Sequence, residues 1–437
     1  MKIRKLACAA CAALTILAVP AVGATSPGLA APSQSLAGPV DQAVSAFYAA
    51  RQGAPLWLRG GPDSPAGQAL IDALKRASLD GLSSGPELAG EAQALLARAQ
   101  SGDASALASA DRLLSAAWVM YVEALQTPPA GMVYADQWVA PRRDSPAQIL
   151  ARAAAAESLA AHVRKISNVN PIYAELRDAA WSAMQANGGQ LDPRVLTSLD
   201  RARDMPFQNR YIMVDAAAAR LYMIEGGRIA DSMKVIVGKS STQTPMLAST
   251  IYYATLNPYW HVSGDMIRSL IARNVLDQGI GYLKSHGYQV LPAEEGDDQL
   301  LNPAKIDWHA VEAGDQLVRI RQLPGPGNSM GRLKFGFANA YDIYLHDTPG
   351  KDLFSQDDRG LSHGCIRLED AERLGRWLMG RDPQPDSTAP EQNVLLPTPV
   401  PIYVTYLTAQ ANDGQLSFVD DVYGKDAQQT SVVASLR

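Results

Sequence analysis

The residues best suited to chemistry surround the cysteine at position 365. The run Ser362-His363-Gly364-Cys365 ends on it, and His346 lies nineteen positions upstream. A cysteine attacks a carbonyl as its thiolate, and a nearby imidazole both lowers the thiol pKa and accepts the proton. We therefore expect covalent catalysis with Cys365 as the nucleophile.

Two histidines compete for the role of general base. His363 is two residues from Cys365, and such close neighbours seldom reach the geometry of proton transfer. His346 ends a predicted strand and can approach from an adjacent one, so we assign it as the base and His363 as a positioning residue. The Asp347 carbonyl is the expected acceptor for the His346 ring N–H. The backbone N–H groups of Gly364 and Cys365 are the expected oxyanion donors.

Two other interpretations of this cysteine remain open. A free cysteine is often a small buried hydrophobe, although the complete Ser-His-Gly-Cys run with an upstream histidine disfavours that role. His346, His363, Cys365 and Asp347 are also the residue types that bind zinc. No Cys-x-x-Cys or His-Glu-x-x-His pattern accompanies them. We expect neither a metal nor a cofactor.

The N-terminus is typical of a secretory signal peptide over residues 1–24, with a basic start, an apolar run over 6–22 and small residues at the cut. The run is shorter than the roughly 20 residues that a spanning helix needs. Cys8 and Cys11 leave with the signal, so the mature chain keeps Cys365 as its single cysteine. We expect export to the periplasm, where a lone thiol cannot form an internal disulfide.

The charge of the mature chain narrows the choice of partners. Of 39 Lys and Arg residues, three lie in the signal peptide, which leaves 36 against 44 Asp and Glu and a formal charge of −8. An acidic chain is a poor partner for nucleic acid or for an anionic membrane surface.

The elements that must position these residues fall into two domains. Residues 25–39 are a Ser-, Pro- and Gly-rich linker, and the Ala- and Leu-rich periodicity over 40–205 predicts an α-helical scaffold domain. From 206 to 428 the chain carries short β-rich runs without long helices between most of them, which favours a sandwich or a barrel-like sheet. A short tail follows over 429–437.

One insertion interrupts the β-rich domain. Over 263–330 the strand pattern gives way to a helical stretch, 265–283, and an acidic loop. We expect this capping subdomain to close over the cleft and exclude water. The predicted fold class is therefore α+β and multidomain: a helical scaffold, then a β-rich catalytic domain with a capping insertion.

The order of these residues resembles a known family. His346, followed by Ser362-His363-Gly364-Cys365 and Arg367, resembles the signature of the L,D-transpeptidase catalytic domain. Other segments are similar to the long, scaffold-bearing branch of that family: Phe47–Arg51, Pro55–Trp57, Asp80–Leu82, Arg210–Val214, Lys234–Lys239, Thr244-Pro245, Asn257–Trp260, Gln322–Asn328, Gly331–Phe335 and Asp420–Gly424.

The resemblance implies a reaction on peptidoglycan stem peptides. Cys365 would attack the bond after the L-centre of meso-diaminopimelate in a tetrapeptide stem and release D-Ala. The side-chain amine of a second stem would then resolve the thioester as a 3-3 crosslink. Carbapenems would inactivate the enzyme by acylating the thiol. We further expect four residues to contact the substrate: Tyr344, Arg367, Trp260 and Asn328.

Two departures from the family pattern and two alternative reactions remain. Only Gly189–Thr197 resembles the branch's compact peptidoglycan-binding module, and His261–Gly264 replaces the usual Asn, Val and Pro. Water could complete the same thioester chemistry, as in an L,D-carboxypeptidase or endopeptidase. The acceptor could instead be an outer-membrane protein that becomes anchored to the wall. A wall-binding scaffold with a dead site is disfavoured, because a structural protein has no need of the full constellation.

Overall fold

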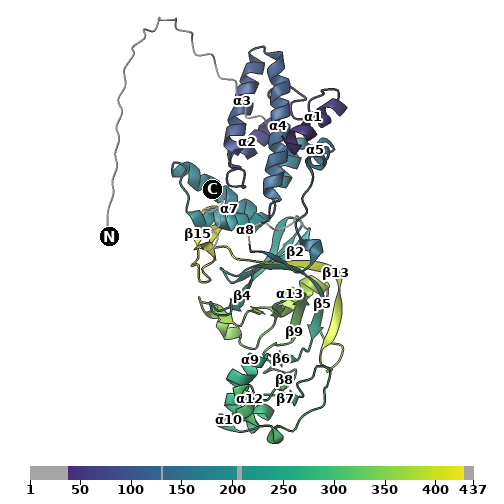
Figure 1. Ribbon diagram of the computed structural model, residues 1–437, viewed down its shortest axis with the longest axis vertical. Helices are drawn as coiled ribbons and strands as arrows, with labels where there is room; N and C mark the ends of the chain where they lie inside the picture. Colours follow the sequence, from purple (N-terminus) through teal and green to yellow (C-terminus); the bar gives the residue numbers. More distant parts are fainter. Residues whose placement is uncertain (1–37, 129–130, 204–208, 428–437) are drawn as a thin grey trace, which may run out of the picture. The chain divides into compact units, whose positions relative to one another are not determined.

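The computed structural model describes residues 38–128, 131–203 and 209–427 (Figure 1). The predicted signal peptide, the C-terminal tail and all but the end of the predicted linker lie outside this part. Within it, no helix combines the length and the apolar character needed to cross a membrane.

The described N-terminal part is helical, as the sequence predicts. Its helices are α1 (Pro39–Ala50), α2 (Pro65–Lys75), α3 (Gly85–Gln100), α4 (Ala104–Leu125), α5 (Pro146–Ala154), α6 (Leu159–Ser167), α7 (Pro171–Ala186) and α8 (Pro193–Arg203). Asp103 accepts hydrogen bonds from the first free N–H groups of α4, and Asn170 does the same for α7. These side chains satisfy donors that a helix start leaves unpaired.

A buried carboxylate ties the first helices together. The two carboxylate oxygens of Asp111, in α4, accept the backbone N–H groups of Leu56, Trp57 and Leu58 at 2.8 Å each. The hydroxyl of Tyr48, in α1, also donates to this carboxylate. Because a buried charge must be satisfied by hydrogen bonds, Asp111 fixes the loop after α1 against α4.

The β-rich part is a sheet that closes on itself. Its strands are β1 (Val133–Tyr134), β2 (Arg210–Asp215), β3 (Arg220–Glu225), β4 (Arg228–Gly238), β5 (Leu247–Leu256), β9 (Leu333–Phe337), β10 (Tyr344–His346), β11 (Gly360–Ser362), β12 (Ile366–Leu368) and β13 (Gln392–Thr405). The order is β1-β5-β13-β2-β3-β4-β12-β10-β9, and β9 pairs again with β5. The barrel-like sheet expected from the sequence is therefore present, with β11 added beside β4.

Local sequence explains two details of this sheet. Gly226 and Gly227 both have positive φ, 60° and 74°, in the two-residue turn between β3 and β4, where side chains would be strained. Helix α13 (Ala371–Met379) begins at Asp370, which accepts the N–H of Arg373. Its apolar face packs into the core of the sheet.

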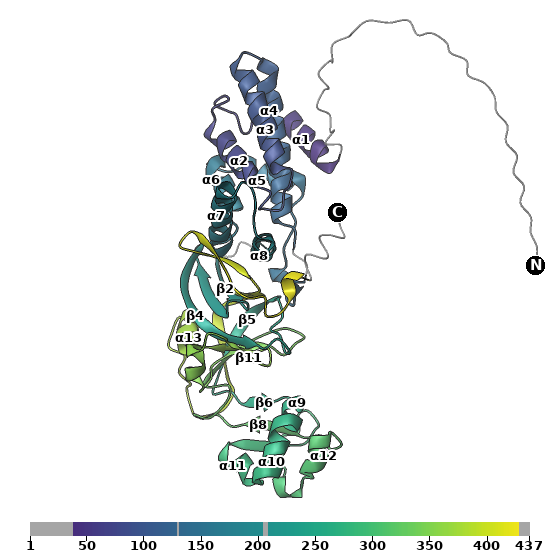
Figure 2. The same cartoon turned by 90° about the vertical axis from the view of Figure 1, so that its left-hand side faces the viewer.

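The insertion that the sequence predicts as a cap has a small core of its own. It consists of β6 (Trp260–Val262), α9 (Gly264–Met266), a π-helical turn (Ile267–Ala272), α10 (Arg273–Gln278), α11 (Gly281–Ser285), β7 (Tyr288–Leu291), α12 (Trp308–Ala313) and β8 (Arg319–Gln322). Figure 2 shows these helices beside β6 and β8. The predicted helix over 265–283 is thus divided, because Gly279, at a φ of 81°, ends α10. The apolar face of these helices is buried against the insertion's own strands.

Short elements complete the described chain. They are the 3-10 turns Gln137–Val139, Pro303–Lys305 and Lys351–Ser355, and the hairpin of β14 (Ala409–Asn412) and β15 (Gln415–Phe418). The overall result confirms the predicted fold class, α+β with an N-terminal helical region followed by a β-rich domain.

Candidate active site

Strand pairing places the candidate nucleophile, Cys365, and the candidate base, His346, on one face of the sheet. β10 and β12 run parallel, with His346 paired to Arg367. Two steps earlier in the same register, just before β12 begins, Cys365 lies beside Tyr344, which hydrogen-bonds to its sulfur. Since alternate residues of a strand share a face, the side chains of Tyr344, His346, Cys365 and Arg367 point to the same side.

The His346 ring is held in one tautomer. Its Nδ1 lies 2.5 Å from the backbone oxygen of Asp347. A carbonyl oxygen can only accept, so Nδ1 carries the proton and Nε2 presents a lone pair. Burial lowers the pKa of His346 to about 3, and the nearby Arg367 charge acts in the same direction. The ring is therefore a neutral proton acceptor.

Asp347 is fixed by its side chain as well. Its carboxylate accepts from Lys351 Nζ at 2.7 Å and from the backbone N–H of Arg332 at 2.9 Å. Gly331 lies so close that a Cβ there would clash with the carboxylate. These contacts fix the carbonyl that orients His346.

The thiol of Cys365 is half-buried. Burial raises its pKa, while hydrogen bonds from the Tyr344 backbone N–H and phenol, and the charges of Lys334 and Arg367, oppose the rise. The sulfur also donates to the backbone oxygen of Asp342 over 3.6 Å. The sequence-based expectation of a lowered thiol pKa is thus wrong for the resting site, because desolvation outweighs the favourable partners.

The turn before the nucleophile is closed by Ser362. Its Oγ donates to the Cys365 carbonyl at 2.6 Å and accepts the Gly364 N–H at 3.0 Å. Gly364 has a φ of 114°, a conformation that L side chains avoid. The Gly364 N–H is therefore engaged within the turn, contrary to the expectation that it faces a substrate carbonyl. The Cys365 N–H is the remaining donor from that expectation.

Of the four residues expected to contact the substrate, two lie beside Cys365 and two lie in or next to the insertion. Tyr344 and Arg367 lie beside Cys365, as described above. Trp260 lies in β6 and packs against the core of the insertion. Asn328 is buried, and its Nδ2 donates to three backbone oxygens while its Oδ1 accepts the Met330 N–H at 2.6 Å. The hydrogen-bonding capacity of Asn328 is thus taken up by neighbouring backbone groups, and its expected contact with substrate stays a prediction.

His363 differs from His346 in its surroundings. The His363 side chain is exposed, and its pKa is lowered by partial burial and by the charge of Lys239. The described contacts include no hydrogen bond between Cys365 and either histidine ring. The observation that favours His346 as the base is therefore its fixed tautomer, in which Nε2 presents a lone pair.

Lys334 is a site residue that the sequence analysis missed. On β9 it is the antiparallel partner of His346, and its Nζ lies 4.3 Å from the ring centre of Tyr344. Its charge opposes the rise in the Cys365 pKa that burial causes. The sequence signal that could have found it is the alternation of apolar residues at Leu333, Phe335 and Phe337. This alternation predicts a strand whose apolar face is buried and whose other face carries Lys334.

Neither a metal centre nor a second catalytic cluster is apparent in the part of the chain that the structure describes. No group of three or more His, Cys, Asp or Glu residues there is arranged to hold a metal ion.

A cavity of about 520 Å³ lies in the helical part, lined by residues that include Trp118, Trp138 and His162. Within it Asp144 is already paired with Arg152 at 2.5 Å.

Comparison with known proteins gives matches to both parts of the chain. Residues 209–402 match the YkuD family model, described as the L,D-transpeptidase catalytic domain, and residues 42–179 match the scaffold domain model. A Haemophilus influenzae protein named "Putative L,D-transpeptidase" is 24% identical over 396 residues, covering 87% of this chain and 78% of that protein.

Solved structures give weaker likenesses. An L,D-transpeptidase from Mycobacterium smegmatis is 15% identical, with 45% of this chain and 58% of that chain covered and a TM-score of 0.22. L,D-transpeptidase 3 from Mycobacterium tuberculosis, in complex with a faropenem-derived adduct, is 13% identical, with 45% and 60% covered and a TM-score of 0.23. The chain thus spans less than two thirds of the length of these solved structures.

Proposed function

Because the chain carries an L,D-transpeptidase catalytic domain behind a scaffold domain, we propose that it is a peptidoglycan L,D-transpeptidase that forms 3-3 crosslinks through a thioester on Cys365. The observation that carries the proposal is the placement of Cys365, just before β12, beside Tyr344 in β10, the strand that also carries His346. His346 is fixed there with Nε2 free to accept a proton. Such a nucleophile and base are what acyl transfer through a thioester requires.

In the acylation step, Cys365 Sγ attacks the carbonyl at the L-centre of meso-diaminopimelate. Since thiol and imidazole are both neutral at rest, the proton passes from Sγ to His346 as the carbon–sulfur bond forms. The oxygen of the tetrahedral intermediate gains negative charge, and the Cys365 N–H is the donor that stabilises it. The carbon–nitrogen bond then breaks, and D-Ala leaves with the proton from His346.

In the second step the side-chain amine of another stem attacks the thioester. His346 takes a proton from this amine, the carbon–sulfur bond breaks, and the proton returns to the thiol. Lys334 and Arg367 place positive charge on the same face, where the carboxylates of a stem peptide would be favoured. We assign Arg367 and Tyr344 as substrate contacts on this ground.

We place this reaction in the periplasm, on the basis of the signal peptide expected over residues 1–24. The substrates are a donor and an acceptor stem. If the acceptor were an outer-membrane protein, or water, the same thioester would give a protein anchor or a trimmed stem.

The test is mass spectrometry of purified disaccharide-tetrapeptides incubated with the mature protein. A transpeptidase produces a dimer whose mass is two donors less one D-Ala, and digestion of the dimer gives fragments linked between the two diaminopimelate residues. Trimmed monomer without dimer would mean that water is the acceptor. Neither product from folded protein would contradict the proposal.

A further inference from the structure

A tyrosine from the C-terminal segment is hydrogen-bonded to the loop that supports the nucleophile. The hydroxyl of Tyr423 donates to the backbone oxygen of Gly238, at the end of β4, and accepts the N–H of Thr244 at 3.4 Å. The side-chain amide of Gln243 donates a hydrogen bond to the Tyr423 carbonyl at 3.2 Å. Tyr423 is 6% exposed, so this hydroxyl joins the two ends of the 238–244 loop away from water.

Thr244 carries the effect of this contact to the catalytic turn. Its Oγ1 accepts the Gly238 N–H at 2.9 Å and donates to the Gly364 carbonyl at 2.8 Å. That carbonyl belongs to the peptide bond between Gly364 and Cys365. Because a trans peptide is planar, with its C=O and N–H on opposite sides, a fixed Gly364 oxygen also fixes the direction of the Cys365 N–H.

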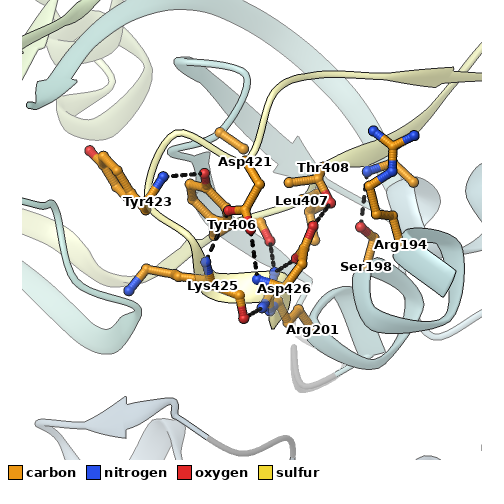
Figure 3. A network of polar contacts seen from close by, with 12 residues as sticks. Arg194, Ser198, Arg201, Tyr406, Leu407, Thr408, Asp421, Tyr423, Lys425 and Asp426 are labelled. Atoms are coloured by element: carbon orange, nitrogen blue, oxygen red, sulfur yellow. Dashed lines mark hydrogen bonds and ion pairs between the residues drawn. The ribbon is translucent and has the colours of Figure 1, made fainter. Parts of the chain in front are cut away.

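Tyr423 is also fixed by polar and ring contacts within the C-terminal segment, and these contacts extend to α8 (Figure 3). Its ring stacks on Tyr406 with centres 5.0 Å apart, and its N–H donates to the Tyr406 hydroxyl at 2.9 Å. Arg201, in α8, donates to the Tyr406 carbonyl at 3.0 Å and to Asp426 at 2.7 Å. Its second nitrogen donates to the Lys425 carbonyl at 2.9 Å. The segment carrying Tyr423 is thereby fixed on both sides.

We propose that Tyr423 is a positioning residue for the acylation step: through Thr244 it sets the Gly364–Cys365 peptide plane and so aims the Cys365 N–H at the oxyanion. This inference rests on the proposed function, because it requires a tetrahedral intermediate at Cys365. It assigns a role in catalysis to a residue that touches neither the thiol nor the base. Arg201 contributes by holding the segment that carries Tyr423.

If Tyr423 has this role, loss of its hydroxyl should affect two reactions of the Cys365 thiol differently. Acylation by a carbapenem passes through a tetrahedral oxyanion, whereas alkylation by iodoacetamide does not. Loss of one oxyanion donor lowers acyl transfer by about 100-fold or more. A donor that is present but misdirected should lower the acylation rate less than a donor that is lost. We therefore expect Tyr423→Phe to lower the acylation rate by about tenfold and to leave the alkylation rate within about twofold of the parent.

A matched control is available in the same domain. Tyr211 is a buried tyrosine whose hydroxyl has no hydrogen-bond partner in the described part of the chain, so Tyr211→Phe removes the same atom without touching the relay. It should leave both rates unchanged. At position 244, Thr244→Val should reproduce the loss and Thr244→Ser, which keeps the hydroxyl, should restore most of the rate.

The experiment measures both rates by intact mass on the mature protein, after thermal unfolding has shown that each variant is folded. Acylation that falls selectively in Tyr423→Phe and Thr244→Val supports the inference. Equal acylation rates in Tyr423→Phe and Tyr211→Phe overturn it, as does a parallel fall in acylation and alkylation. If Tyr423→Phe does not fold, the two Thr244 variants decide the question. A parent protein that is alkylated but never acylated would instead contradict the proposed function.

Discussion

His346 donates from Nδ1 to the backbone oxygen of Asp347 over 2.5 Å, so a main-chain group orients the proposed base. A carbonyl oxygen fixes the ring without adding a charge. The imidazole therefore stays neutral in its buried position and can take the thiol proton only as the bond to substrate forms. This neutral pair differs from a preformed thiolate–imidazolium pair, and the two predict different pH behaviour.

The choice of base is tested by comparing two histidine variants. His346→Ala should lower the rate at which Cys365 reacts with a carbapenem near neutral pH by at least about tenfold, because the proton acceptor is lost. His363→Ala, at an exposed position, should have a smaller effect. Rates are read by intact mass spectrometry. A larger loss in His363→Ala than in His346→Ala would reverse the assignment.

The low pKa of His346 also predicts how stability depends on pH. Its pKa is about 3 in the folded protein, against about 6.5 in an unfolded chain. As the pH falls below 6.5 the unfolded chain takes up the proton first, so the stability contributed by neutral His346 is lost progressively between about pH 6.5 and 3. Between pH 7 and 4.5 this loss is about 2.5 kcal/mol.

Denaturant unfolding at both pH values measures this contribution. His346→Asn should lose about 2.5 kcal/mol less than the parent on acidification, because it has no group to protonate there. His309→Asn, at an exposed position in α12, serves as the control and should behave as the parent does. Identical pH dependence in the parent and His346→Asn would show that the ring is not held neutral by burial.

The sequence and the structure agree where the signal is local. Helical periodicity, the Gly226-Gly227 turn and the cysteine motif each follow from neighbouring residues, so the helical region, the β-rich domain and the candidate catalytic residues could be predicted. Closure of the sheet by pairing of β9 with β5 depends on residues about 80 positions apart and leaves no such signal.

The features of the site that could not be predicted from the sequence have a similar origin. Asn328 lies in a segment that resembles the family and is polar, but its burial and its three acceptors are set by the folding of the insertion. The thiol pKa depends on how deeply Cys365 is covered, which the motif does not encode. Lys334 and Tyr423 reach the site through strand register and a C-terminal contact that the sequence alone could not place.

A carbapenem should label the mature protein once. Acylation of Cys365 adds one drug mass, and the modified peptide should contain residue 365. A chelator should leave turnover unchanged, because the proposed steps use only protein groups. Loss of activity on chelation, restored by zinc, would instead favour the metal interpretation of His346, His363 and Cys365.

The insertion over 263–330 is predicted to shield the thioester from water. The insertion has its own core. Near its C-terminal end, Asn328 Nδ2 donates a hydrogen bond to the Pro258 carbonyl at 3.1 Å. Replacing 263–330 with a short Gly-Ser linker should raise the ratio of trimmed monomer to crosslinked dimer, because water gains access to the acyl enzyme. Circular dichroism and thermal unfolding establish that the sheet is retained. An unchanged ratio in folded protein would mean that the insertion is not a lid.

The most direct test of the central claim is to isolate the acyl enzyme. The mature protein is mixed with a disaccharide-tetrapeptide, quenched in acid within seconds, digested and mapped by mass spectrometry. The account predicts a donor stem lacking D-Ala, attached as a thioester to the peptide that contains Cys365 and released by hydroxylamine. Cys365→Ala should be folded, carry no adduct and form no product. Turnover by Cys365→Ala above a tenth of the parent rate, or an adduct on another residue, would contradict the account.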